Sequence, residues 1–147
     1  MHPTFHWLKT RMFCYSTENE DLMTECLENL VGENIEYEIA ESEHGNRIVI
    51  FLSEMKKQKE FISLFSKLDD DLLKFIVDDI DNRIDDDCVF YLRLDKQDFV
   101  QGRFKVAHDG DVVSITGKVM SHPARKEIAK KNVLDFISSL RQQGTNP

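Results

Sequence analysis

The sequence of 147 residues contains little glycine, proline or cysteine. Its 6 Gly and 3 Pro are too few for long flexible linkers. The 3 Cys are odd in number and widely spaced, which argues against a disulfide framework and favours a reducing compartment. No apolar run approaches the roughly 20 residues of a membrane helix, and no basic stretch followed by an apolar block opens the chain. We therefore expect neither a membrane span nor a secretory signal.

Motifs of common enzyme families are also missing. The chain has no glycine-rich phosphate loop, no GxSxG and no HExxH. The cysteines form no CxxC pair and the five histidines share no ligand spacing, so we expect no metal and no cofactor. The acidic clusters at residues 69–71, 78–81 and 85–87 match no EF-hand loop and are interpreted as solvated helix ends. The chain is therefore predicted not to be an enzyme, and it offers no catalytic residues.

The net charge is −8, from 19 basic and 27 acidic residues, and it is unevenly distributed. Residues 101–147 carry 8 basic and 4 acidic side chains, whereas residues 1–100 are strongly acidic. Salt screens charges that lie more than about 8–10 Å apart, so binding depends on local fields. A basic patch for nucleic acid is therefore compatible with the acidic total.

The composition predicts a soluble globular chain, with 41% hydrophobic and 31% charged residues. We expect residues 1–147 to form a single domain whose tail, from residue 142, is frayed. Hydrophobic periodicity predicts the order β-α-β-β-α-α-β-β-β-α. Strands are expected over 5–15, 35–41, 47–53, 88–94, from 102 to a turn at 108–110, and 111–121; helices over 17–31, 56–67, 69–84 and 123–141. The predicted fold class is α+β, a mainly antiparallel sheet with helices packed on it.

Two local signals support this order. Thr17 followed by Glu20 is a capping box for the first helix. His44-Gly45-Asn46 is a turn that joins the second and third strands into a hairpin, because Gly and Asn tolerate positive φ.

Aromatic and basic residues alternate with apolar ones along the first strand. If Leu8, Met12 and Cys14 face the core, the residues that face away are Trp7, Lys9, Arg11, Phe13 and Tyr15. The same reasoning exposes Arg93, Arg103 and Lys105. Such a surface suits single-stranded RNA, since bases stack on flat rings and cations meet phosphates. The alternative is a sheet covered by helices on both faces, with Trp7 and Phe13 in the core.

A second basic group lies in the last helix. Its members are Arg125, Lys126, Lys130 and Lys131. It is either part of a nucleic-acid surface or an ordinary solvated helix face.

The turn His44-Gly45-Asn46 and the later stretch Tyr91-Leu92-Arg93-Leu94-Asp95-Lys96-Gln97 resemble an archaeal family of small proteins described as predicted exosome subunits or RNA-binding domain proteins. The resemblance covers nearly the whole chain. It implies a fold similar to that of the ribosomal large-subunit protein that binds five-S rRNA, and an RNA-linked role in the cytoplasm of an archaeon. The chain departs from the family at Asp98-Phe99, where small or apolar residues are common. An acid beside Lys96 weakens phosphate attraction there.

The residues and the resemblance together predict a non-catalytic RNA-binding protein or a component associated with an RNA-processing complex such as the exosome. The candidate RNA-binding residues are Lys9, Arg11, His44, Gly45, Asn46, Arg93, Lys96, Gln97, Arg103 and Lys105. For the family motif, the alternative is a structural salt bridge of Arg93 with Asp95 or another acid. For the whole chain, the alternative is a protein-interaction adaptor whose acidic residues 1–100 dock a basic partner without contacting RNA.

Overall fold

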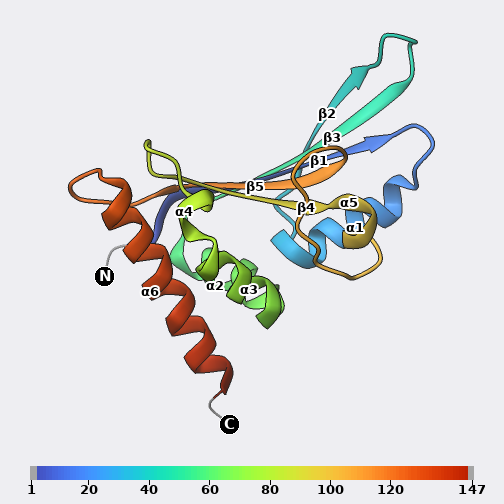
Figure 1. Ribbon diagram of the computed structural model, residues 1–147. Coiled ribbons are helices and arrows are strands. Elements are labelled where there is room, and N and C mark those ends of the chain that lie inside the picture. Colours follow the sequence, from blue (N-terminus) through green and yellow to red (C-terminus); the bar gives the residue numbers. More distant parts are fainter. Residues whose placement is uncertain (1–2, 146–147) are drawn as a thin grey trace. The chain divides into compact units, whose positions relative to one another are not determined.

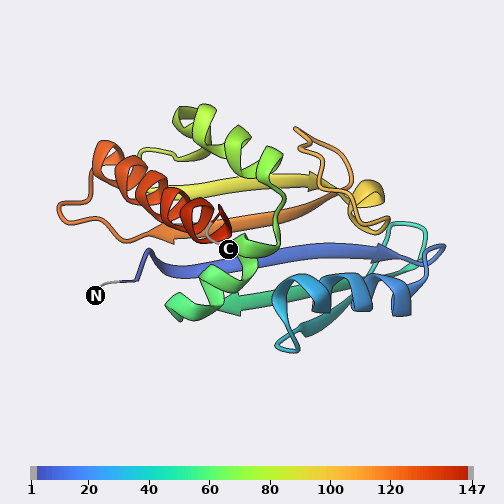
Figure 2. The same ribbon diagram turned by 90° about the horizontal axis from the view of Figure 1, so that it is seen from below.

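A computed structural model describes residues 3–145 and contains a single five-stranded sheet. The strands are β1 (Phe5–Tyr15), β2 (Glu36–Glu41), β3 (Arg47–Met55), β4 (Val89–Asp95) and β5 (Val112–Val119). The helices are α1 (Glu20–Val31), α2 (Gln58–Lys67), α3 (Asp70–Asp78), α4 (Ile80–Arg83), α5 (Lys96–Phe99) and α6 (Lys126–Thr145). The strand order is β2-β3-β1-β5-β4, and neighbouring strands are antiparallel (Figures 1 and 2). The predicted α+β class with an antiparallel sheet is confirmed.

The contacts within the chain divide it into two compact units. Unit 1 comprises residues 1–8, 55–92 and 116–147, and unit 2 comprises residues 9–54 and 93–115. Unit 1 is electrically neutral, with 12 basic and 12 acidic residues. Unit 2 has 7 basic and 15 acidic residues, a net charge of −8, and contains all ten candidate RNA-binding residues. The expectation that the chain is a single domain stays a prediction.

The core of unit 1 is built around the ring of Phe5. Its centroid lies 5.3 Å from that of Phe61, 5.8 Å from Phe65 and 6.1 Å from Phe136. Pairs of this kind contribute about 0.5–1.5 kcal/mol each beyond the burial of their apolar area. Strict alternation along β1 would put Phe5 on the same face as Lys9, but Phe5 is fully buried. The alternation is therefore interrupted near the start of β1.

Four helices contribute to unit 1, where α6 packs against α2, α3 and α4. The Asp69 carboxylate accepts the Leu72 N–H at 2.8 Å, which confirms the acidic cap at this helix start. The predicted helix over 69–84 is wrong in length, because it breaks at Asp79 into α3 and α4. The carboxylate of Asp79 instead accepts the Asn82 side-chain amide at 2.8 Å and stabilises a new short helix. Nor does Pro123 begin the last helix, since α6 begins at Lys126.

The far end of the last helix also differs from the prediction. α6 continues to Thr145, beyond the predicted helix end at residue 141, and the expectation of a frayed tail from residue 142 stays a prediction. The remainder of that tail, residues 146–147, lies outside the described residues. Within residues 3–145, no helix combines the length and the apolar character needed to cross a bilayer.

In unit 2 the predicted hairpin is confirmed. β2 pairs with β3 in a register that runs from Glu36 opposite Leu52 to Glu41 opposite Arg47. Gly45 has φ +77° in the connecting turn, which is the left-handed backbone that favours glycine. The Gly45 N–H donates to the Ser42 carbonyl at 2.9 Å.

The start of α1 differs from the predicted capping box. The helix begins at Glu20, and its first N–H groups are capped by Asn19, whose side-chain oxygen accepts the Leu22 N–H at 3.1 Å. Thr17 lies too early in the chain for this role. The buried face of α1 consists of Met23, Leu27, Leu30 and Val31.

The predicted strand from Gly102 does not form. Gly102 has φ +83°, and the segment from Val100 to Asp111 is irregular apart from one bridge between Val106 and Leu94. The short helix α5, with Asp95 as its N-terminal cap, directly precedes this segment in the sequence. The observed order is therefore β-α-β-β-α-α-α-β-α-β-α, with one strand fewer and two more short helices than predicted.

Candidate nucleic-acid interface

One face of β1 in unit 2 carries the predicted aromatic and basic residues. Thr10, Met12 and Cys14 are buried, whereas Lys9, Arg11 and Tyr15 are exposed and Phe13 is half-buried. The helices of this unit, α1 and α5, lie on the other side of its strands (Figure 1). The alternative of a sheet covered on both faces is therefore wrong for this part of β1.

The side chains on this open face contact one another. The Arg11 guanidinium lies 4.7 Å from the centroid of the Phe13 ring, a cation–π distance. The rings of Phe13 and Tyr15 are 6.4 Å apart and tilted by 45°. A planar cation and two partly accessible rings thus follow one another at alternate positions of a single strand. This arrangement provides stacking surfaces and a phosphate-binding group on the same line.

Lys9 and Arg93 add charge to this face. The Lys9 ammonium lies 3.8 Å from the Glu54 carboxylate on β3, and both side chains are about half exposed. The exposed Arg93 on β4 donates to the His108 carbonyl at 3.3 Å. In the described part of the chain Arg93 forms no ion pair with Asp95, which accepts the Asp98 N–H at 2.9 Å instead. The structural salt bridge considered for the motif is therefore absent, and the Arg93 guanidinium stays at the surface.

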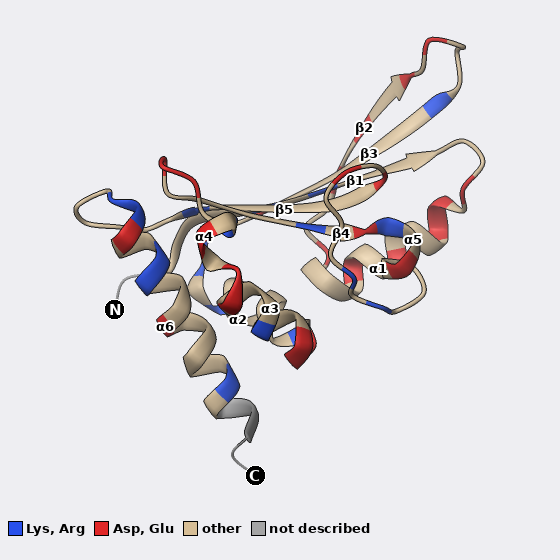
Figure 3. Cartoon of the chain, in the orientation of Figure 1, with Lys and Arg blue, Asp and Glu red and all other residues tan. Residues whose placement is uncertain are grey.

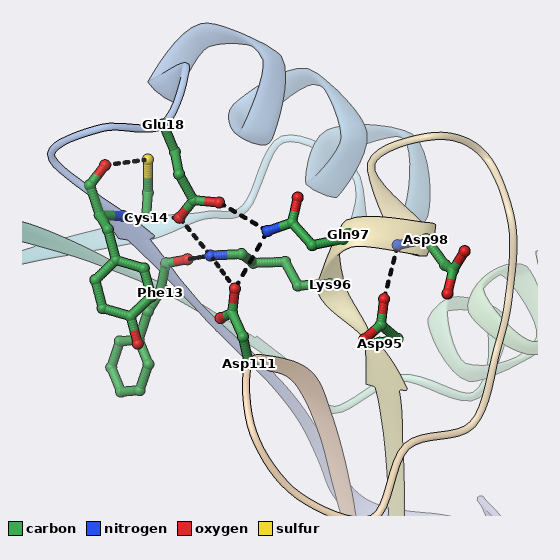
Figure 4. A network of polar contacts seen from close by, with 9 residues as sticks. Phe13, Cys14, Glu18, Asp95, Lys96, Gln97, Asp98 and Asp111 are labelled. Atoms are coloured by element: carbon green, nitrogen blue, oxygen red, sulfur yellow. Dashed lines mark hydrogen bonds and ion pairs between the residues drawn. The ribbon is translucent and has the colours of Figure 1, made fainter.

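Lys96 lies in the interior of unit 2. Its side chain is fully buried, so this candidate RNA-binding residue does not present its charge at the surface. The ammonium contacts the Glu18 carboxylate at 2.5 Å, the Asp111 carboxylate at 3.0 Å and the Phe13 carbonyl at 2.8 Å (Figure 4). It also lies 4.7 Å from the centroid of the Tyr15 ring. A buried ammonium is tolerated only with such partners, because desolvation of an unpaired charge is costly.

Gln97 completes this network. Its side-chain amide donates to Glu18 at 3.1 Å and to Asp111 at 3.3 Å. Partial burial by itself raises the pKa of Glu18, but the hydrogen bonds from Lys96, from the Tyr15 backbone and from Gln97 outweigh it and hold the pKa below its ordinary value. The network joins the end of β1, α5 and the start of β5 within unit 2 (Figure 4). It fixes the backbone that carries Phe13 and Tyr15.

A family model described as RNA binding matches residues 7–119. The chain belongs to this RNA-binding family. The match includes every candidate residue of unit 2.

Similar proteins are found in several archaea. The RNA-binding protein PAB1135 of Pyrococcus abyssi is 31% identical over 146 residues, which cover 90% of this chain and 93% of that protein. Among solved structures, Mth689, a DUF54 protein from Methanothermobacter thermautotrophicus, is 27% identical with a TM-score of 0.75, over 91% of this chain and 98% of the other. The DUF54 protein AF2318 from Archaeoglobus fulgidus is 21% identical with a TM-score of 0.70, over 92% and 99%, and supports the fold alone.

The other candidate residues of this RNA-binding family member lie apart from the β1 face. The turn residues His44, Gly45 and Asn46 are exposed at the tip of the hairpin. Arg103 is held by Asp98 at 3.0 Å, next to α5. Lys105 is exposed, but on the irregular segment and not on a strand. The structure therefore groups Lys9 and Arg11 on one strand and leaves the turn and the 103–105 segment as separate elements.

The basic run of the last helix belongs to unit 1. Lys130 pairs there with Asp81 and, at 3.3 Å, with Glu127. The hydrogen bond that the Asp81 carboxylate accepts from Lys130 raises the pKa of Lys130 and lowers that of Asp81. Arg125 and Lys131 are exposed. At least one member of the run is thus neutralised by acids of its own unit.

Sequence reasoning missed Glu18 and Asp111. Neither belongs to a motif, and both lie far from Lys96 along the chain. One local pattern in the sequence points to this network. Lys96 and Gln97 follow directly after Asp95, and a helix cap at Asp95 turns the next residue back toward the sheet. Acidic residues also dominate α1 and the hairpin of this unit (Figure 3). The basic field of the β1 face is therefore local.

Proposed function

We propose that this chain binds single-stranded RNA without catalysis, on the open face of β1 in unit 2. Phe13 and Tyr15 stack on bases, and Arg11 meets a phosphate. Lys9 and Arg93 are further phosphate contacts at the margin of this surface. Membership of an RNA-binding family supports the class of ligand.

The observation that carries the proposal is the line of Arg11, Phe13 and Tyr15 on the exposed side of β1, where the ring of Tyr15 also lies over Lys96 of α5. In a unit with a net charge of −8, affinity cannot come from a general attraction to phosphate. It must come from stacking, worth about 1–3 kcal/mol per base, together with a few local cations. We therefore expect moderate affinity and a shallow salt dependence.

The test is a fluorescence-anisotropy titration of a labelled oligouridylate at two salt concentrations. Arg11→Ala should weaken binding and reduce the salt slope by about 0.7, the value for one phosphate contact on a single strand. The matched control is Lys74→Ala, which removes one exposed charge from α3 of unit 1. Equal effects of the two variants, or no binding by the unchanged protein, would exclude this surface.

The proposal has four finer parts. These are a link to the exosome, protein subunits of an RNA-processing complex as partners, a cytoplasmic location, and likeness to the ribosomal protein that binds five-S rRNA. Copurification from an archaeal host, with and without nuclease, tests the first two. Recovery of the same proteins after nuclease treatment supports a complex. Their loss on nuclease treatment supports RNA as the only bridge.

A further inference from the structure

The outer edge of β2 is an open strand edge. β2 is the terminal strand of the sheet order, and within the described residues it pairs only with β3. In an antiparallel pair, every second residue directs its N–H and C=O away from the partner strand. This edge therefore offers backbone donors and acceptors to an additional strand. In Figure 1, β3 lies between β2 and β1, so that β2 is the outermost of these three strands.

The opposite edge of the sheet, at β4, is covered by the chain itself. In unit 2, Leu94 is bridged to Val106, and the Ala107 N–H donates to the Arg93 carbonyl at 3.0 Å. In unit 1, Ile84 is bridged to Phe90. Covering of this kind is a common protection against edge-to-edge association. β2 lacks it.

The side chains of β2 alternate between acidic and apolar. Glu36 and Glu38 lie on the face of Leu52 and Ile50, their partners on β3. Tyr37 and Ile39 lie on the other face, and 52% and 65% of their surfaces are exposed. They are the two most exposed large apolar residues among those described. An exposed apolar pair beside free backbone groups is typical of an interaction site.

The negative charge around β2 indicates which kind of partner can bind at its edge. Residues 33–46 contain five glutamates and no lysine or arginine. Within the described part of the chain, neither Glu36 nor Glu38 takes part in an ion pair. A second copy paired through β2 would place glutamates near glutamates, and like charges on neighbouring strands are destabilising. RNA is repelled for the same reason.

We propose that the outer edge of β2 docks an extended basic segment of a partner protein, which adds to the sheet as a sixth strand. Lysine or arginine side chains of that segment pair with Glu36 and Glu38. Apolar side chains at the alternate positions cover Tyr37 and Ile39. The site goes beyond RNA binding and uses none of the residues assigned to the RNA surface.

The probe is a synthetic peptide of about eight residues in which lysine and valine alternate, the length of a typical strand. It is titrated into the isotopically labelled full chain and followed by NMR. We expect saturable binding, and slower amide hydrogen exchange at Tyr37 and Ile39. A peptide of the same composition, with its lysines in one block, should bind at least about tenfold more weakly. It cannot place lysines beside the glutamates on one face and valines over Tyr37 and Ile39 on the other.

Charge reversal on the protein gives the matched comparison. Glu36→Lys with Glu38→Lys should weaken binding of the alternating peptide about tenfold. Glu25→Lys with Glu28→Lys makes the same change in net charge on the exposed face of α1 and should change affinity less than about twofold. Equal losses in the two variants would overturn the proposal, because they indicate unspecific attraction to an acidic protein.

Three further results would also overturn it. These are exchange protection on β1 and not on β2, a dimer of the unchanged protein that the β2 variant disperses, and displacement of the peptide by oligouridylate. The β2 variant should bind oligouridylate at least as tightly as the unchanged protein, because Glu36 and Glu38 lie on the sheet face of Lys9 and the change makes that face less acidic. Failure of peptide docking with intact RNA binding therefore counts against this site alone.

Discussion

Lys96 and Glu18 are 78 positions apart in the sequence, yet their charged groups lie 2.5 Å apart in the interior of unit 2. Their contact connects the end of the strand that carries Phe13 and Tyr15 to the short helix α5. The residue that most resembles a phosphate-binding lysine in the sequence thus has a structural role.

Lys96→Met should destabilise the protein by about 3–5 kcal/mol, because it leaves two carboxylates near one another without their cation. Urea denaturation measures this loss. Lys105→Met, which removes an exposed lysine of the same unit, should stay within about 0.5 kcal/mol of the unchanged protein. If Glu18→Gln restores no stability in the Lys96→Met background, the loss has another cause.

The same contact predicts a dependence of stability on pH. The pKa of Glu18 lies below its ordinary value of 4.5 in the folded protein, so its contribution is fully present above pH 4.5. It is lost as the pH falls through the folded-state pKa. The difference in unfolding free energy between the unchanged protein and Glu18→Gln should therefore shrink in acid. Glu25→Gln, at an exposed position of α1, is the control for the loss of one negative charge.

Tyr15→Ala should weaken oligouridylate binding by about 1–3 kcal/mol, the contribution of one stacked base. Tyr15→Phe should retain most of the affinity, because the ring stays. Tyr37→Ala is the control, because it removes a tyrosine side chain from β2, outside the proposed RNA surface. A melting curve of each variant separates lost stacking from lost stability, since Tyr15 also lies over Lys96.

Gly117→Ala tests the close packing of unit 1. A Cβ at this position would lie 2.8 Å from Cδ1 of both Leu8 and Phe5. Phe5 cannot move aside because other rings surround it, so we expect a loss of about 1–3 kcal/mol in thermal or urea unfolding. The double variant with Leu8→Ala should lose less than the sum of the two single changes. Strict additivity would contradict the proposed clash.

Local patterns predicted most of the elements. The hairpin around Gly45 and the cap at Asp69 are both determined by neighbours in sequence, and both are confirmed. The predictions failed where distant residues decide. Phe5 is drawn into the core by aromatic rings from α2 and α6, against the alternation of its own strand.

The candidate site shows the same division. Alternation alone identified Lys9, Arg11, Phe13 and Tyr15 as outward-facing. It could not place Lys96, because burial of a lysine depends on acids supplied by other segments, here Glu18 and Asp111. Nor could alternation show that the stretch after Gly102 pairs with β4 only through the bridge between Val106 and Leu94, within the described residues.

The difference between the two sheet margins sets a limit on assembly. Growth of a filament by strand addition needs one accepting edge and one donating edge on every molecule. Because segments of the chain occupy the β4 margin, only β2 remains for such addition within the described residues. Association through the sheet should therefore stop after one strand, with a one-to-one stoichiometry and no fibrous polymer.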